Sequence, residues 1–261
     1  MIDRIYRIED NGTARQVVER DGVISLLDGD MFDLYRPGRE IGRVEQAGAL
    51  PAGLRVLAPV IPSKIVGIGR NYREHAAETG KPVPTEPVIF IKPSTAVIGP
   101  GQPIRLPPGA GRVDHEAEIA VVVRRLASHV PRERAKEFVL GITCSNDVTA
   151  REMQRRGVQF SHCKGYDTFA PLGPCIAVGL DVSAVQVEGW VNGQRRQAAS
   201  SADMIFPIDE LIAYISSIMT LLPGDVISTG TPAGIGTLVP GDTVTVKVEG
   251  VGELTNPVVE G

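Results

Sequence analysis

The sequence predicts a mostly β protein with some α-helix, an α+β fold in two parts. Residues 1–60 should form a small β-rich N-terminal domain, and residues 61–261 a larger domain that carries the chemistry. The chain contains 29 Gly and 20 Pro but only 5% aromatic residues, which indicates many short strands and tight turns around an aliphatic core. Its 261 residues are enough to bury one large core with a small appendage.

Composition and charge exclude several classes of partner. The formal net charge is −4, and charged residues of both signs are interspersed. We find no basic stripe suited to nucleic acid and no Lys/Arg run suited to an anionic membrane. The first ten residues carry charges where a secretory signal needs an apolar run, and no window approaches the ~18 apolar residues of a spanning helix. Three cysteines without CxxC spacing indicate reduced thiols, so we expect a cytoplasmic protein.

The N-terminal 60 residues alternate apolar and polar positions between turn signals. Asn11-Gly12 and Asp21-Gly22 are typical of hairpin turns, because these residues tolerate a positive φ. The segment has no histidine and no cysteine, which favours a structural or dimer-forming role. Prolines at 51, 59 and 62 mark its end.

A buried strand and a short helix follow. Residues 64–69 form an apolar run that ends in Gly67-Ile68-Gly69, but a dinucleotide fingerprint needs a third glycine and a βαβ unit. Residues 73–78 suggest a helix on which His75 and Glu78, three positions apart, share a face. A carboxylate on one imidazole nitrogen raises the basicity of the other, as a general base acting on water requires. The alternative is an ordinary surface pair.

The stretch from Arg112 to Val123 predicts a metal site. In a strand, Asp114, Glu116 and Glu118 project to one face while Ala117 and Ile119 pack into the sheet. Carboxylates at that spacing repel, and a hard divalent cation with oxygen ligands neutralises them if they are buried. A solvated strand face is the alternative, but the run ends in Ile-Ala-Val-Val-Val, which is typical of a buried strand.

Further polar residues lie at the ends of predicted elements. Lys92 follows the strand 88–91 and is either a site cation or a strand-end charge. A helix is predicted near 132–138, then a strand over 139–144. Asp147 precedes a helix expected from Thr149 onward, so it is a metal ligand or an N-cap.

The C-terminal half adds one more candidate for the chemistry. Lys164 could stabilise an oxyanion or simply face solvent. His115 and His162 have no second histidine at ligand spacing and are interpreted as structural or surface residues. Residues 204–222 carry a helical apolar face, and the glycine-rich loop 228–236 is interpreted as a turn that lines a site.

Six motifs, in order between residues 64 and 250, resemble the fumarylacetoacetate hydrolase family. The resemblance is to its smaller bacterial branch, which contains acylpyruvate hydrolases, oxaloacetate decarboxylases and hydroxyheptadienedioate isomerases. The motifs are Gly69-Arg-Asn-Tyr-x-x-His75, Phe90-Ile-Lys-Pro-Ser-Thr95, His115-Glu-Ala-Glu-Ile119, Asn146-Asp-Val-Thr-Ala-Arg-Glu-Met-Gln154, Lys164-Gly-Tyr-Asp-Thr-Phe169 and Thr229-Gly-Thr-Pro232. The sequence departs from commoner patterns at Phe160, where many relatives carry tryptophan, and at Cys163.

The resemblance implies a mixed β-roll catalytic domain, a homodimer and one Mg²⁺ or Mn²⁺ per subunit. It implies that Glu116, Glu118 and Asp147 hold the metal, which leaves out Asp114. It also implies that His75 and Glu78 activate water, on a segment that forms a lid in the family. Other matches fall on residues that hold the substrate or lie near it, namely Lys164, Gln154, Thr231, Arg70 and Lys92.

The residues and the resemblance together suggest a mechanism. A 2-oxo acid or 1,3-diketone would chelate the cation, which polarises the carbonyl and stabilises the developing enolate. His75 would deprotonate water, and Lys164 would stabilise the oxyanion. We therefore expect a hydrolase that cleaves a C–C bond in a 2,4-dioxo acid. The alternatives are an oxaloacetate decarboxylase, a 2-hydroxyhepta-2,4-diene-1,7-dioate isomerase or decarboxylase, and a catalytically silent protein that binds metal or ligand.

Overall fold

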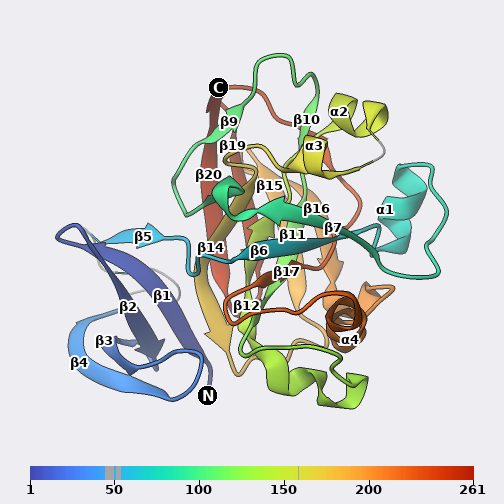
Figure 1. The fold of residues 1–261 in the computed structure, drawn as a ribbon. Helices are drawn as coiled ribbons and strands as arrows, with labels where there is room; N and C mark the ends of the chain where they lie inside the picture. Colours follow the sequence, from blue (N-terminus) through green and yellow to red (C-terminus); the bar gives the residue numbers. More distant parts are fainter. Residues whose placement is uncertain (45–49, 51–53, 158) are drawn as a thin grey trace.

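The computed structural model describes residues 1–44, 50, 54–157 and 159–261. Strands dominate and helices are few and short, as the sequence predicts (Figure 1). The largest sheet has twelve strands among the described residues, and two smaller sheets have three and five. Pro51, one of the prolines that mark the predicted domain boundary, lies outside the described residues.

Four N-terminal strands form one end of the large sheet, in blue in Figure 1. The predicted turns are confirmed: Asn11 and Asp21 have φ of 49° and 52°, and the glycine after each also has a positive φ. Strand β1 pairs with β14 of the larger part, so the sheet is continuous across the predicted boundary near residue 60, which stays a prediction. The four strands are β1 (Asp3–Asp10), β2 (Thr13–Arg20), β3 (Val23–Gly29) and β4 (Tyr35–Arg43).

The large sheet continues through six strands in the order β14, β12, β11, β17, β6 and β7. Their bounds are β14 (Ala170–Val178), β12 (Val139–Asn146), β11 (Ala117–Val123), β17 (Val226–Ser228), β6 (Lys64–Gly69) and β7 (Val88–Pro93). Two short strands lie beside this path: β5 (Arg55–Leu57) pairs with β1, and β8 (Val97–Ile98) pairs with β14. Every residue of β11 is buried, as expected of a central strand covered on both faces.

Two smaller sheets complete the fold. One contains β13 (Thr149–Ala150), β10 (Val113–His115) and β18 (Gly236–Thr237). The other contains β16 (Gln194–Ser200), β15 (Gln186–Val191), β19 (Thr243–Val248), β20 (Gly252–Glu260) and β9 (Ile104–Leu106). The hairpin predicted at Asn192-Gly193 joins β15 and β16.

The described residues form four α-helices and three 3-10 helices. They are α1 (Arg73–Glu78), α2 (Arg151–Arg156), α3 (Ser161–Lys164) and α4 (Ile208–Ile218), with 3-10 helices η1 (Ser94–Ala96), η2 (Arg132–Phe138) and η3 (Ser201–Asp203). The helix predicted over 73–78 is confirmed. The helix near 132–138 is of the 3-10 type. In α4 the predicted apolar face is buried, with Leu211, Ile212 and Ile215 at 1% exposure or less.

Two predictions around the site were wrong in detail. The helix expected from Thr149 begins at Arg151, because Thr149 and Ala150 pair with β10 as strand β13. The strand predicted over 112–123 is broken at Glu116, between β10 and β11. There the Glu116 N–H donates to the side chain of Asn146 (2.9 Å), and the Glu116 carbonyl accepts from the Asp147 N–H (2.9 Å). This break brings residue 116 beside residue 147.

The described residues include no helix long and apolar enough to cross a membrane. All three cysteines are buried and unpaired, as the sequence predicts.

Candidate active site

Three buried carboxylates converge where β11 and β12 lie side by side. Glu116 precedes β11, Glu118 lies within it, and Asp147 follows the end of β12. In the antiparallel register Ala117 faces Asn146, so the ends of the two strands hold these residues together. One ligand oxygen from each residue lies within 4.8 Å of the others, and each residue is at most 4% exposed. We call Glu116, Glu118 and Asp147 the acid cluster.

Asp114 faces the same cavity as Glu116 and Glu118 but is not part of the acid cluster. Its two oxygens accept from Arg112 at 2.7 and 3.0 Å, and the Arg151 Nε donates to it at 2.8 Å. Two guanidinium groups therefore balance the charge of this carboxylate. Among the described residues, the only group of three carboxylates whose oxygens lie within 4.8 Å of one another is Glu116, Glu118 and Asp147.

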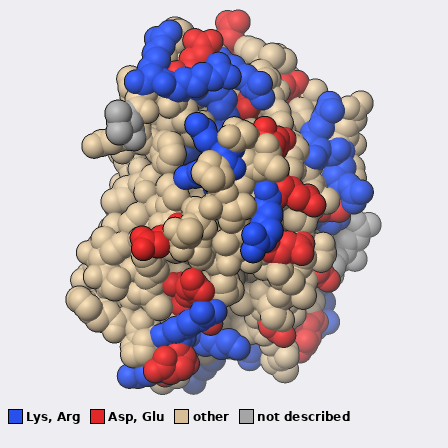
Figure 2. Space-filling view, turned by 90° about the vertical axis from the view of Figure 1, so that its right-hand side faces the viewer, with Lys and Arg blue, Asp and Glu red and all other residues tan. Residues whose placement is uncertain are grey.

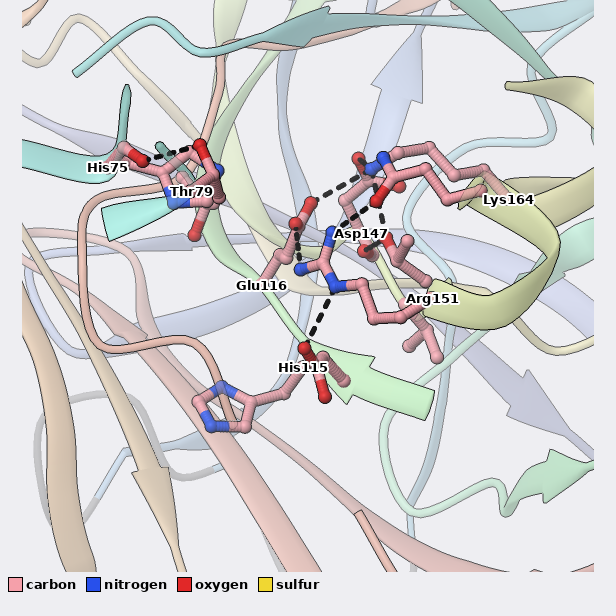
Figure 3. Close-up of polar contacts among 12 residues, drawn as sticks. His75, Thr79, His115, Glu116, Asp147, Arg151 and Lys164 are labelled. Atoms are coloured by element: carbon pink, nitrogen blue, oxygen red, sulfur yellow. Dashed lines mark hydrogen bonds and ion pairs between the residues drawn. The ribbon is translucent and has the colours of Figure 1, made fainter. Parts of the chain in front are cut away.

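Three cations contact the acid cluster, and Figure 3 labels two of them, Arg151 and Lys164. Lys164 donates to Glu116 (2.9 Å), to Asp147 and to the Thr149 hydroxyl. Arg151 donates to Glu116 (2.5 Å). Lys92 donates to Asp147 (2.5 Å) and to the Phe169 carbonyl (2.6 Å). Burial acts to raise the pKa of Glu116, but the charges of Lys164 and Arg151 outweigh it and hold that pKa well below its usual range.

Glu118 has no cation of its own among the described residues. It accepts hydrogen bonds from the Ser228 hydroxyl (2.5 Å) and the Gly230 N–H (3.0 Å). Burial, followed by the negative charges of Asp147 and Glu116, raises the pKa of Glu118 well above its usual value. A divalent cation at this point would remove that repulsion. The donor set contains only carboxylate oxygens, which fits a hard cation such as Mg²⁺ or Mn²⁺.

The structure brings His75 and Glu78 into contact on α1. The His75 Nδ1 lies 3.0 Å from one Glu78 oxygen, and the other Glu78 oxygen accepts from the Gly234 N–H at 2.9 Å. Glu78 is thus fixed between the helix and the glycine-rich loop. With Nδ1 engaged, Nε2 is the histidine nitrogen left to act on a ligand.

A cavity of about 870 Å³ joins these groups. Its wall includes the dyad His75 and Glu78 and two members of the acid cluster, Glu116 and Glu118. The predicted substrate contacts Arg70, Gln154, Lys164 and Thr231 also line it, as does Phe160. Lys92 is not among the residues that line the cavity. Its side chain is 1% exposed and its ammonium contacts Asp147, so it neutralises a buried carboxylate.

Gln197 is a site residue that the sequence reasoning missed. Its amide nitrogen donates to the Thr231 hydroxyl and to the Pro232 carbonyl, both at 2.7 Å. Its oxygen accepts from the Ala117 N–H (2.9 Å) and contacts the His115 Nδ1 (3.1 Å). Gln197 therefore ties the Thr231 loop to the strand that carries Glu118. No local pattern marks it, because all its partners are at least 34 residues away.

The same contacts define which ring nitrogen of His115 carries the proton. His115 points away from the acid cluster in Figure 3. Because the Gln197 oxygen already accepts from Ala117, the His115 Nδ1 must carry the proton in that contact. His115 is 1% exposed, and burial lowers its pKa. The expectation of a structural histidine holds, whereas a surface position is excluded.

Comparison with known proteins agrees with this fold. The family model for the fumarylacetoacetate (FAA) hydrolase C-terminal region matches residues 64–259. The chain is therefore an enzyme of the fumarylacetoacetate hydrolase family.

Three relatives illustrate the likeness. A protein of Mycobacterium tuberculosis is 48% identical over 211 residues, which cover 80% of each chain. The crystal structure of 5-carboxymethyl-2-hydroxymuconate delta-isomerase from Mycobacterium smegmatis has 44% identity and a TM-score of 0.87, over 99% of this chain and 100% of that one. The structure of 2-hydroxyhepta-2,4-diene-1,7-dioate isomerase from Mycobacterium marinum has 38% identity and a TM-score of 0.88, over 98% of each.

Proposed function

We propose that this enzyme is a divalent-metal-dependent hydrolase that cleaves a C–C bond in a 2,4-dioxo acid of the acylpyruvate type. One observation carries the proposal: the same cavity contains a histidine–carboxylate dyad and two members of a buried acid cluster. A dyad of this kind activates water, and an all-oxygen cluster suits a hard cation. Glu116, Glu118 and Asp147 would hold one Mg²⁺ or Mn²⁺. When bound, the ion would act as a Lewis acid toward the substrate's 2-oxo acid group.

The residues of the chain supply the remaining steps. The His75 Nε2 takes a proton from water, and Glu78 stabilises the resulting imidazolium through Nδ1. The water oxygen bonds to C4 of the substrate, and Lys164 stabilises the oxyanion formed there. The C3–C4 bond then breaks. Its electron pair stays on C3 and takes up the proton that His75 removed from water, so the products are pyruvate and a second carboxylic acid and His75 is neutral again.

The surroundings of the dyad support this assignment. Glu78 is held by the Gly234 N–H as well as by His75, so the imidazole has a defined orientation. His75 is only 5% exposed, which limits competing solvent at its ring. Phe90 and Phe160 pack edge to face at 5.5 Å, and the Lys164 ammonium lies 4.6 Å from the centre of the Phe90 ring. This apolar side of the cavity lowers the local dielectric constant, which strengthens the electrostatic interaction of the Lys164 ammonium with a nearby oxyanion.

The second candidate is an isomerase or decarboxylase of a related dicarboxylate. Two similar solved structures are named isomerases, which favours this alternative. Both reactions develop an enolate next to a 2-oxo acid, but neither needs attack by water. They would use the acid cluster and Lys164 but would not need His75 and Glu78 to activate water.

One experiment separates these functions. The Mn²⁺-loaded enzyme and its His75→Ala variant are incubated with acylpyruvates, oxaloacetate and 2-hydroxyhepta-2,4-diene-1,7-dioate, and each product is measured. A hydrolase should cleave acylpyruvates, and loss of the general base should lower kcat by about 10²–10⁴-fold. His162→Ala, at an exposed histidine on α3, is the matched control and should keep full activity. Acylpyruvate cleavage that survives in His75→Ala would contradict the dyad, and turnover of only the other two substrates would support the second candidate.

A further inference from the structure

A second, smaller cavity lies beside the active-site cavity. Its volume is about 480 Å³, and its wall comes from β10, β15, β16 and the segment 234–237. Ile235 lines both cavities, and the Gly234 N–H donates to Glu78 at 2.9 Å. The two cavities therefore share one loop, which also holds the carboxylate of the dyad in place. We call the smaller one the second cavity.

His115 contributes a hydrogen-bond acceptor that has no partner. Its Nδ1 carries the proton and donates to Gln197, so Nε2 can only accept. This Nε2 is buried and has no hydrogen-bond partner among the described residues. The side chain of His115 lines the second cavity, and Figure 3 shows its ring turned away from the acid cluster. A buried acceptor in this position needs a donor, and a ligand in the second cavity could supply it.

Gly236 leaves room in front of this nitrogen. It pairs with His115 in the register of β10 and β18. A Cβ at position 236 would lie 3.2 Å from the His115 Nε2, which is closer than ordinary van der Waals contact. The backbone does not require glycine here, because Gly236 has no positive φ. What the glycine provides is open space beside the imidazole.

Arg196 brings a positive charge to the same cavity. Its side chain is exposed, and its Nη2 donates to the Gln194 side chain at 2.9 Å. It forms no ion pair with any described carboxylate, whereas its neighbour Arg195 pairs with Glu188 at 3.0 Å. Figure 2 looks onto the side where α1 lies in Figure 1, and Lys and Arg side chains gather along the upper edge of that side. Such an edge attracts anions.

We propose that the second cavity binds a small hydroxy carboxylic acid, with the carboxylate on Arg196 and the hydroxyl donating to the His115 Nε2. The guanidinium only donates and the imidazole nitrogen only accepts, so the ligand must carry both an anionic acceptor and an O–H group. An ionised 2-oxo acid has no O–H group to donate and is disfavoured. A volume of about 480 Å³ suits a ligand of a few carbons. This inference does not depend on the reaction proposed above.

Nuclear magnetic resonance of the Mg²⁺-loaded enzyme, with ¹⁵N in its histidine rings, tests this without turnover. The chain has only four histidines, so each ring can be followed. The probes are lactate and 3-hydroxybutanoate, each compared with the same acid without the hydroxyl, and propane-1,2-diol, which lacks the carboxylate. A hydroxy acid should move the His115 Nε2 signal upfield and saturate it, with a Kd on the order of 1 mM. The compounds that lack one group should bind about 5–10-fold more weakly.

Three variants complete the test. Gly236→Ala fills the space beside Nε2 and should abolish the shift. Arg196→Gln should weaken hydroxy acid binding by about fivefold and leave diol binding unchanged, and it keeps the inference testable if Gly236→Ala unfolds. Arg195→Gln is the matched control, because Arg195 is exposed on the same strand but does not line the second cavity.

The signals of His75 show whether a probe binds in the active-site cavity instead. A saturable shift of His115 that is lost in Gly236→Ala and retained in Arg195→Gln supports the inference. Three results would overturn it: no saturable shift of His115 with either hydroxy acid, a shift of His75 alone, or equal affinity for acids with and without the hydroxyl.

Discussion

Replacement of Gln197 by leucine should destabilise the protein and loosen the cavity. The change keeps roughly the same volume but removes an amide that makes four contacts of 2.7–3.1 Å. The Ala117 N–H, the His115 Nδ1–H and the Pro232 carbonyl would then be buried without their partner. Each such group costs about 1–3 kcal/mol, and water and local relaxation recover part of that. We therefore expect the free energy of unfolding to fall by about 3–5 kcal/mol.

Urea denaturation of the unaltered protein and the variant, each in chelator and in Mn²⁺, measures this loss. Gln194→Leu is the matched control, because Gln194 is exposed on the same strand and its side chain accepts, among the described residues, only from exposed Arg196. The free energy of unfolding of Gln194→Leu should lie within about 0.5 kcal/mol of that of the unaltered protein. Gln197→Glu keeps an acceptor for Ala117 but places a buried carboxylate against the Pro232 carbonyl, so at pH 7 it should cost at least as much stability as Gln197→Leu. A loss below about 1 kcal/mol for Gln197→Leu would refute the idea that this amide joins the loop to the strand.

Three further predictions concern stability. Asp225→Asn should cost about 2–4 kcal/mol at pH 7, because Asp225 is fully buried and accepts from Leu222, Ser63 and Lys64. Burial acts to raise the pKa of Asp225, but those bonds lower it overall, so its stabilisation is present above the unfolded pKa of about 4 and is lost as pH falls through the folded pKa. The unfolding free energies of the two proteins should therefore converge in acid, and a constant gap would contradict this. Arg70→Gly should raise the free energy of unfolding, by no more than about 1 kcal/mol, because glycine relieves the strain of a positive φ. A clearly lower Tm in the variant would argue against strain at this position. Removal of Mn²⁺ from protein at a hundred times its dissociation constant should lower the unfolding free energy by about 2.7 kcal/mol, or Tm by about 5 °C, and an unchanged melting curve would contradict a metal site.

Much of the local structure could be predicted because its causes are local. The turns at Asn11-Gly12 and Asp21-Gly22 follow from residues that tolerate a positive φ, and the structure has them there. The contact between His75 and Glu78 follows from helical spacing. The aliphatic run 119–123 predicted a buried strand, since a strand without polar residues must be covered on both faces, and every residue of β11 is buried.

The pairing of charges could not be predicted, because it depends on long-range register. Glu116 takes its cations from residues 35 and 48 positions away, and Lys92 reaches Asp147 across 55. The sequence left Lys92 open between a site cation and a strand-end charge, and the structure places it behind the acid cluster. Thr149 was expected in a helix because its neighbours favour one, but pairing with β10 overrides that preference. Gln197 was missed because its hydrogen-bond partners also lie far from it in the sequence.

Direct titration of the metal-free protein with Mn²⁺, followed by electron paramagnetic resonance of the free ion, tests the central claim that the acid cluster binds one divalent cation. We predict one tight site per chain. Glu118→Gln, which removes one of three carboxylate ligands, should weaken it by at least about 100-fold. Glu78→Gln, a carboxylate in the same cavity but outside the acid cluster, should leave it nearly unchanged. Equal affinity in the unaltered protein and Glu118→Gln, or no saturable Mn²⁺ binding at all, would contradict the account.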